Sequence, residues 1–377
     1  VLKIDMLSLD FIKILKKNGI KFFTGIPDSL MKKFIFHLED KDLSIDHYIA
    51  ANEGSAIGLG IGYHLSTKKV PLIYLQNSGL GNCINPIVSL AHQKIFSIPM
   101  VLLIGWRGEE GKKDEPQHIK QGEITEKLLK LLDIQYIILD KGVKETKISA
   151  LIKISKNNSK PIALLVRKNF FQSNDSMPLP TNKYPLKRED VINLVVKNAS
   201  NKDIIVSTTG MASRELLEIR SKLPKKNYCD FMTIGGMGHA SQIALGIALN
   251  NKKKKVICLD GDGSLIMHMG GMTSIGFNKP GNFKHIIINN GVHGSVGNQP
   301  TVSMNLDLKS IAKGCGYEYV SSSISKDATN KKIKHMFNSN KCSFLEVKIN
   351  TEHRDKLIRP TKHPKFYKNE FIKKLIY

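Results

Sequence analysis

Short apolar runs alternate with longer amphipathic segments along the whole chain, which is the pattern of strands and helices around a parallel β-sheet. In the first half, apolar runs predict strands at Lys21–Phe23, His47–Ile49, Leu72–Leu75, Met100–Ile104, Tyr136–Leu139 and Ile162–Val166. The second half repeats the pattern, with strands predicted at Ile204–Ser207, Cys229–Phe231, Val256–Leu259, His285–Ile288, Glu318–Val320 and Phe344–Ile349. We therefore expect an α/β protein built from two doubly wound parallel-sheet domains.

A polar stretch separates the two halves. Ser173–Lys187 carries three prolines together with serine, asparagine and aspartate, a composition typical of a linker. Two domains are also the default for a chain of 377 residues. The pattern thus predicts one domain over residues 1–172, a linker over 173–187 and a second domain over 188–377.

Composition narrows the class of protein. Apolar residues make up 41% of the chain, enough for packed cores, and no apolar run approaches the length of a membrane span. Leu2–Gly19 includes Asp5 and Asp10, so we expect an amphipathic helix there and not a signal peptide. The five cysteines are scattered without a CxxC pair, which favours reduced thiols and a cytoplasmic protein with no membrane partner.

The formal net charge of +24 raises the hypothesis of nucleic-acid binding. No zinc finger, RNA-binding signature or basic heptad region accompanies the charge, and Lys252–Lys255 fits a turn before a strand. We therefore expect a lysine-rich solvated surface and no nucleic-acid partner. The same charge would raise the local concentration of a polyanionic substrate.

The strongest candidate site combines Gly261–Ser264, which is Gly-Asp-Gly-Ser, with the pair Asn289-Asn290. Each follows a predicted strand, and the crossover between those strands predicts a right-handed βαβ unit. Asp262 and Asn290 then lie just beyond the C-terminal ends of parallel strands, where open α/β sheets bind their ligands. One carboxylate and one amide oxygen suit Mg²⁺, and the glycines let the backbone approach a phosphate closely. These residues predict a metal-bridged diphosphate site.

Gly-Asp-Gly followed across a crossover by Asn-Asn resembles the motif of thiamine diphosphate enzymes. The resemblance implies a pyrimidine-binding and a diphosphate-binding domain, with no room for the middle domain of larger family members. It also implies that Asp262, Asn290 and the carbonyl of Val292 hold Mg²⁺. Phosphate oxygens would be bound by Thr209, Gly263, Ser264 and Ser295. Gly235 and Met237, in one glycine-rich run, would also bind the cofactor, with Met237 holding thiamine bent. A methionine of the core is the alternative.

Glu53 is an isolated acidic residue among small and apolar ones, at the start of a helical segment that follows a strand. An acidic residue in the first turn of a helix is the simpler explanation, because the helix dipole favours it there. Beside a thiamine motif, the resemblance instead implies the catalytic glutamate that binds the aminopyrimidine ring of the cofactor and activates it.

A charged loop, Gly105–Gly122, follows the predicted strand Met100–Ile104. Loops at strand ends often carry function, although a plain solvated loop is the alternative. The loop resembles a segment of the phosphonopyruvate decarboxylases, a short branch of the thiamine diphosphate-dependent 2-oxo acid decarboxylases. Three other stretches share this resemblance: Gly25–Ser29, Asn289–Thr301 and Arg359–Thr361. It implies that Asp28 and His118 transfer protons. A phosphonate would be bound by Arg107, Lys112, Lys113 and Lys120.

The resemblance implies a carboxy-lyase that converts 3-phosphonopyruvate to phosphonoacetaldehyde and CO₂ in phosphonate biosynthesis. Sulfopyruvate decarboxylation, which would keep every cofactor residue, and acetolactate-type condensation of two 2-oxo acids are the alternatives. A catalytically silent binding protein is a third, and intact Glu53 and Asp262 argue against it. The family further implies a homo-oligomer with active sites between subunits, so that Glu53 and Asp262 of one site come from different chains.

Overall fold

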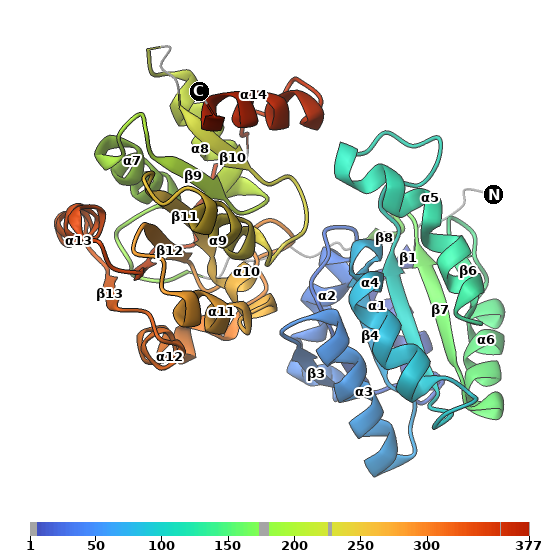
Figure 1. Cartoon of the computed structure of the whole chain (residues 1–377). Coiled ribbons are helices and arrows are strands. Elements are labelled where there is room, and N and C mark those ends of the chain that lie inside the picture. The colour runs from blue at the N-terminus through green and yellow to red at the C-terminus, as the bar shows by residue number, and fades with distance from the viewer. Residues whose placement is uncertain (1–5, 173–180, 225–227, 355, 377) are drawn as a thin grey trace. The chain divides into compact units, whose positions relative to one another are not determined.

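The computed structural model describes residues 6–172, 181–224, 228–354 and 356–376. Its internal contacts divide the chain into two compact units, Val1–Pro178 and Leu179–Tyr377. Each unit contains one six-stranded sheet in which every pairing is parallel, and Figure 1 shows helices packed around each sheet. The predicted fold class, two doubly wound α/β domains without a middle domain, is confirmed.

The sheet of the first unit has the strand order β3-β2-β4-β5-β7-β6. Its strands are β2 (Phe22–Gly25), β3 (Asp46–Ile49), β4 (Leu72–Gln76), β5 (Met100–Gly105), β6 (Gln135–Leu139) and β7 (Pro161–Val166). The helices around it are α1 (Ser8–Lys17), α2 (Lys32–Leu38), α3 (Glu53–Thr67), α4 (Leu80–Pro86), α5 (Pro116–Leu131) and α6 (Glu145–Asn158). A separate two-stranded sheet joins β1 (Met6–Leu7) to β8 (Phe171–Gln172). Strands β5 and β7 are buried along their whole length, as expected for central strands covered on both faces.

The sheet of the second unit has the order β10-β9-β11-β12-β14-β13. Its strands are β9 (Ile204–Ser207), β10 (Cys229–Met232), β11 (Val256–Gly261), β12 (Phe283–Asn289), β13 (Tyr319–Ser323) and β14 (Ser343–Lys348). The helices are α7 (Arg188–Asn198), α8 (Met211–Ser221), α9 (Ala240–Asn250), α10 (Asp262–Met267), α11 (Gly271–Asn278), α12 (Leu308–Cys315), α13 (Lys326–Asn338) and α14 (Pro364–Ile376). Successive residues of β11 point to opposite faces of the sheet: Cys258 packs in one apolar core and Leu259 packs in another. Both faces of this sheet are therefore covered.

Each strand predicted from an apolar run is present, with shifts at the ends. Strand β13 begins at Tyr319 and continues through three serines, because its backbone pairs with β14 whatever the side chains are. The predicted helix over Leu2–Gly19 covers Ser8–Lys17, after the short strand β1. The crossover from β11 to β12 contains two helices, α10 and α11. None of the helices in the described parts of the chain is long and apolar enough to span a membrane.

The predicted linker falls partly outside the described residues, which omit 173–180. Its described part, residues 181–187, packs on the second unit. The Asn182 side chain donates to the carbonyl of Ile349 at 3.1 Å, and the carbonyl of Leu186 accepts from the Asn350 N–H at 2.8 Å. The Leu186 side chain is buried in a core of that unit. This segment therefore continues the second unit.

Candidate active site

Four neighbouring strands of the second unit end at the same edge of its sheet, and each is followed by a segment predicted to bind cofactor. Strands β10, β9, β11 and β12 are adjacent in that order. Gly235 and Met237 follow β10, Thr209 follows β9, Gly263 and Ser264 follow β11, and Asn290, Val292 and Ser295 follow β12. Parallel strands place their C-terminal ends together, so the sheet brings these segments to one edge, as expected for Asp262 and Asn290.

Ser264 joins three of these segments. Its hydroxyl accepts from Thr208 Oγ1 at 3.0 Å and from the Gly238 N–H at 3.0 Å. The fourth segment is close to them, because a Cβ added at Gly210 would lie 2.9 Å from Ser295 Oγ. Gly210 has φ +92°, a conformation that favours glycine, at the start of α8. Backbone N–H groups and hydroxyls therefore line one small region at the end of the sheet.

Asp262 is the first residue of α10 and is buried. Its Oδ2 accepts from Thr301 Oγ1 at 2.5 Å and from Ser303 Oγ at 2.8 Å. Burial raises the pKa of Asp262, and these hydrogen bonds offset the effect only in part. Among the described residues no lysine, arginine or histidine forms an ion pair with this carboxylate. A buried carboxylate with only neutral partners fits a site for a bound cation.

The loop after β12 curls back so that its far end reaches Asp262. Asn290 Oδ1 accepts from the Val292 N–H at 3.2 Å, and the Thr301 N–H donates to the Gly291 carbonyl at 2.8 Å. Asn290 is buried, and Val292 forms an isolated bridge with Pro300. The loop thus brings an amide side chain and a main-chain segment to the same strand end as the buried carboxylate.

The two asparagines of the Asn-Asn pair differ in role. Asn289 Nδ2 donates to Glu346 Oε1 at 2.8 Å, and Asn289 Oδ1 lies 2.8 Å from Ser303 Oγ. Asn289 therefore ties β12 to β14 and to the Thr301–Ser303 segment. A nearby imidazole is neutral at pH 7, since burial lowers the pKa of His293 to about 4.

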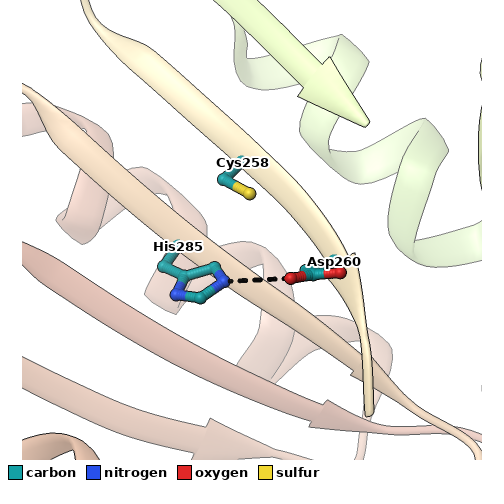
Figure 2. A group of neighbouring side chains, drawn as sticks. All are labelled: Cys258, Asp260 and His285. Carbon is teal, nitrogen blue, oxygen red and sulfur yellow. Dashed lines mark ion pairs between the residues drawn. The ribbon is translucent and has the colours of Figure 1, made fainter. Parts of the chain in front are cut away.

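Behind Asp262, three fully buried side chains form a cluster that the sequence analysis did not single out (Figure 2). Cys258 and His285 are opposite each other in the β11–β12 register, and the ligand-type atoms of Cys258, Asp260 and His285 lie within 4.8 Å of one another. Asp260 Oδ1 accepts from the Gly261 N–H at 2.9 Å, and its Oδ2 lies 3.6 Å from His285 Nε2. The cluster therefore holds the corner at which β11 passes into α10. Strand register, with these residues on one face, is the signal that could have found it.

In the first unit, Glu53 begins α3 and its side chain is buried. Glu53 Oε2 accepts from Asn82 Nδ2 at 2.7 Å. Among the residues that the structure describes, Oε1 accepts no hydrogen bond. A Cβ added at Gly79 would lie 2.3 Å from that same oxygen, so Gly79 leaves the space that Glu53 fills. A buried carboxylate with one oxygen left to bond fits a partner that presents a ring nitrogen or an N–H group.

Asp28 lies in the loop after β2 and is fully buried. Its Oδ1 accepts from Gln76 Nε2 at 2.6 Å and its Oδ2 from the Leu30 N–H at 3.0 Å. Burial raises the pKa of Asp28 despite these hydrogen bonds, so the carboxyl keeps its proton to a higher pH than an exposed aspartate does. Gly105 makes room for it, because a Cβ there would lie 2.2 Å from Oδ2.

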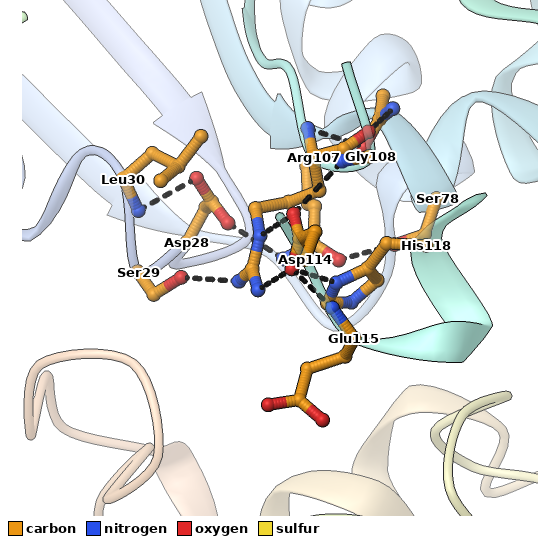
Figure 3. A network of polar contacts seen from close by, with 11 residues as sticks. Asp28, Ser29, Leu30, Ser78, Arg107, Gly108, Asp114, Glu115 and His118 are labelled. Carbon is orange, nitrogen blue, oxygen red and sulfur yellow. Dashed lines mark hydrogen bonds and ion pairs between the residues drawn. The ribbon is translucent and has the colours of Figure 1, made fainter. Parts of the chain in front are cut away.

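A polar network connects the charged loop to Ser29 (Figure 3). Arg107 binds both oxygens of Asp114, at 2.8 Å through Nε and 2.5 Å through a terminal nitrogen, and its other terminal nitrogen donates to Ser29 Oγ at 2.9 Å. His118 Nδ1 contacts Asp114 Oδ1 at 3.0 Å. Burial disfavours ionised Asp114, but the bonds from Arg107 and His118 outweigh it and hold its pKa well below the ordinary value. Burial lowers the pKa of His118, and the bond to Asp114 opposes that shift.

The four cationic side chains predicted to bind the substrate differ in their ion-pair partners. The Arg107 guanidinium is already paired with Asp114. Lys120 pairs with Glu123 at 2.9 Å on the exposed side of α5. Lys112 and Lys113 are exposed in the loop and form no ion pair among the described residues. Within the described parts of the chain, the two loop lysines are thus the members of this set without an ion-pair partner.

Comparisons with known proteins bear on both units. The model of the "Thiamine pyrophosphate enzyme, N-terminal TPP binding domain" matches residues 7–129, and that of the "C-terminal TPP binding domain" matches residues 208–347. A phosphonopyruvate decarboxylase of Streptomyces viridochromogenes is 30% identical over 337 residues, covering 85% of this chain and 82% of that protein. A sulfopyruvate decarboxylase subunit beta of Methanocaldococcus jannaschii is 41% identical over 166 residues, 44% of this chain and 84% of that subunit. The subunit alpha from the same organism is 37% identical over 127 residues, 34% of this chain and 72% of that subunit.

Proposed function

The chain belongs to the thiamine diphosphate-dependent 2-oxo acid decarboxylases, and we propose that its substrate is 3-phosphonopyruvate, converted to phosphonoacetaldehyde and CO₂. The chain is thus a carboxy-lyase with thiamine diphosphate as its cofactor. The observation that carries the choice of substrate is the 30% identity to a phosphonopyruvate decarboxylase over 85% of the chain. The unpaired lysines of the loop after β5 favour the same choice, because they supply positive charge that pyruvate would not need.

The residues of the second unit fit Mg²⁺ and a diphosphate. The metal ion would be held by Asp262, the Asn290 side chain and the Val292 carbonyl. It would supply the positive charge that buried Asp262 does not receive from a neighbouring side chain among the described residues. The diphosphate would be bound by Thr209, Gly263, Ser264 and Ser295. Met237, partly buried beside Gly235, would support the bent cofactor.

When bound, thiamine diphosphate supplies the electron sink for carbon–carbon cleavage. Glu53 would hydrogen-bond the aminopyrimidine ring through Oε1, the oxygen that Asn82 leaves available, and would hold or release one proton there. Loss of CO₂ leaves a carbon that must take up one proton. His118 is the more accessible donor, with its orientation set by Asp114, whereas Asp28 is fully buried and burial raises the pKa of its carboxyl.

Sulfopyruvate is the second candidate substrate, favoured by the 41% identity to a sulfopyruvate decarboxylase subunit. Its sulfonate has the same tetrahedral oxygens and one charge fewer than a fully ionised phosphonate. The test is kcat/KM of the full chain with thiamine diphosphate and Mg²⁺ on 3-phosphonopyruvate, sulfopyruvate and pyruvate. We expect 3-phosphonopyruvate to lead, by about a hundredfold over pyruvate. A preference for sulfopyruvate, or equal efficiency on pyruvate, would overturn the substrate assignment, and products condensed from two 2-oxo acids would indicate a carboligase.

We also propose that the protein is a homo-oligomer in which Glu53 of one subunit and Asp262 of another complete each active site. The division of the relatives from Methanocaldococcus jannaschii into separate alpha and beta subunits supports this arrangement. In this chain the two sets of cofactor residues likewise belong to two separate compact units.

A further inference from the structure

A basic cavity lies within the first unit, beside the Arg107 network. Its volume is about 330 Å³, at the lower end of the range for small-molecule pockets. Five lysines from three segments line it: Lys32 and Lys33 at the start of α2, Lys112 and Lys113 in the loop after β5, and Lys168 after β7. We call it the lysine pocket. Only Lys112 and Lys113 were predicted from the sequence.

The acidic side chains around the lysine pocket do not neutralise it. Glu109 pairs with Arg167 at 2.7 Å, and Asp114 is bound by Arg107. Lys33 donates to the neutral Gln172 side chain at 2.8 Å. In the described parts of the chain the other four lysines form no ion pair. Several ammonium groups around one cavity repel one another, and a bound polyanion would relieve that repulsion.

The walls of the lysine pocket suit the head of a small anionic molecule. Trp106 and Phe171 are buried apolar residues that limit water on one side. Ser29, Arg107 and Asp114 belong both to this cavity and to the polar network of Figure 3. A molecule with an oxyanion at one end and a 2-oxo acid at the other could therefore use both.

We propose that the lysine pocket binds a tetrahedral oxyanion, and that this group is the phosphonate end of the substrate. The assignment of this oxyanion to the phosphonate rests on the proposed function. Lys32, Lys33 and Lys168 thereby join Lys112 and Lys113 as residues that determine specificity, while Arg107 positions the network through Asp114. Free inorganic phosphate has the same chemistry and is the other source of such a ligand.

The test compares single Lys→Gln variants of the full chain. Lys112→Gln and Lys168→Gln alter two different segments of the pocket, and Lys130→Gln alters an exposed lysine on α5 outside it. We expect each pocket variant to lose about tenfold or more in kcat/KM on 3-phosphonopyruvate, chiefly through KM, and far less on pyruvate. Lys130→Gln should match the unaltered protein, and equal thermal melting would exclude misfolding. Unchanged kinetics in both pocket variants, an equal loss on pyruvate, or an equal loss in Lys130→Gln would overturn the proposal.

Inorganic phosphate separates the two sources of oxyanion. Competition with 3-phosphonopyruvate that weakens in Lys112→Gln and Lys168→Gln supports the substrate site. Inhibition or activation by phosphate that does not compete with 3-phosphonopyruvate, yet disappears in those variants, would assign the pocket to free phosphate. It would overturn the assignment to the phosphonate of the substrate. If the unaltered protein does not decarboxylate 3-phosphonopyruvate, the proposed function fails by itself. Calorimetric titration with phosphate then tests the pocket alone, and absence of binding would overturn it.

Discussion

A methyl group at Gly79 would collide with the carboxylate of Glu53. The added Cβ would lie 2.3 Å from Oε1 and 2.5 Å from both Cδ and Cγ, well inside ordinary contact distance. Gly79 has φ −82°, so alanine fits the backbone and the effect of Gly79→Ala is purely steric. Glu53 has little room to move, because it is buried and bonded to Asn82. Keeping it in place costs about 1–3 kcal/mol of overpacking, so we expect Glu53 to be displaced.

Displacement of Glu53 should lower turnover by about 10²–10⁴, the usual contribution of a proton-transfer group. Gly81→Ala is the matched control, since its Cβ meets nothing within 4 Å and α4 gains a better helix former there, by about 0.5–1 kcal/mol. The assay is steady-state turnover at saturating thiamine diphosphate, with cofactor affinity from calorimetry and Tm from circular dichroism. Equal turnover of Gly79→Ala and Gly81→Ala would show that Gly79 does not set the position of a catalytic Glu53.

Three further predictions concern the proposed cofactor site and assembly. Glu53→Gln should reduce turnover by about 10²–10⁴ while it keeps thiamine diphosphate affinity, and normal turnover would remove Glu53 from the mechanism. Because folding raises the pKa of Asp262, the stability that this group contributes is present below the unfolded pKa near 4 and is lost as pH rises through the folded pKa. Asp262→Asn should therefore raise the Tm of EDTA-treated protein more at pH 8 than at pH 5, and a constant difference would contradict this. Mixing Glu53→Gln with Asp262→Ala protein under demonstrated subunit exchange should restore activity, and no recovery would argue against shared sites.

The sequence was sufficient for the sheets because central parallel strands must be apolar. Strand β12 is buried at every position, and its core, His285–Ile288, was predicted from the apolar run alone. The same rule missed most of β13, where Ser321–Ser323 pair with β14 through the backbone. The strands β1 and β8 are two residues each, and only contact between distant parts of the chain creates them.

For the site, the strand-end motifs were predictable and the pairings were not. Asp262 and Asn290 could be placed by topology, because each directly follows a strand. By contrast, nothing in the local sequence indicates that Asp114 folds back onto Arg107 and pairs with its guanidinium. The lysine pocket could not be predicted from the sequence for the same reason. Lys32 and Lys168 line one cavity only because the tertiary structure brings distant segments together.

The most direct test of the account is ³¹P NMR of 3-phosphonopyruvate incubated with the full chain. With thiamine diphosphate and Mg²⁺, we predict conversion to phosphonoacetaldehyde with one CO₂ released for each molecule, and no catalysed conversion when the cofactor is omitted. Unchanged 3-phosphonopyruvate in the presence of cofactor-loaded protein, or conversion that does not depend on thiamine diphosphate, would contradict the account.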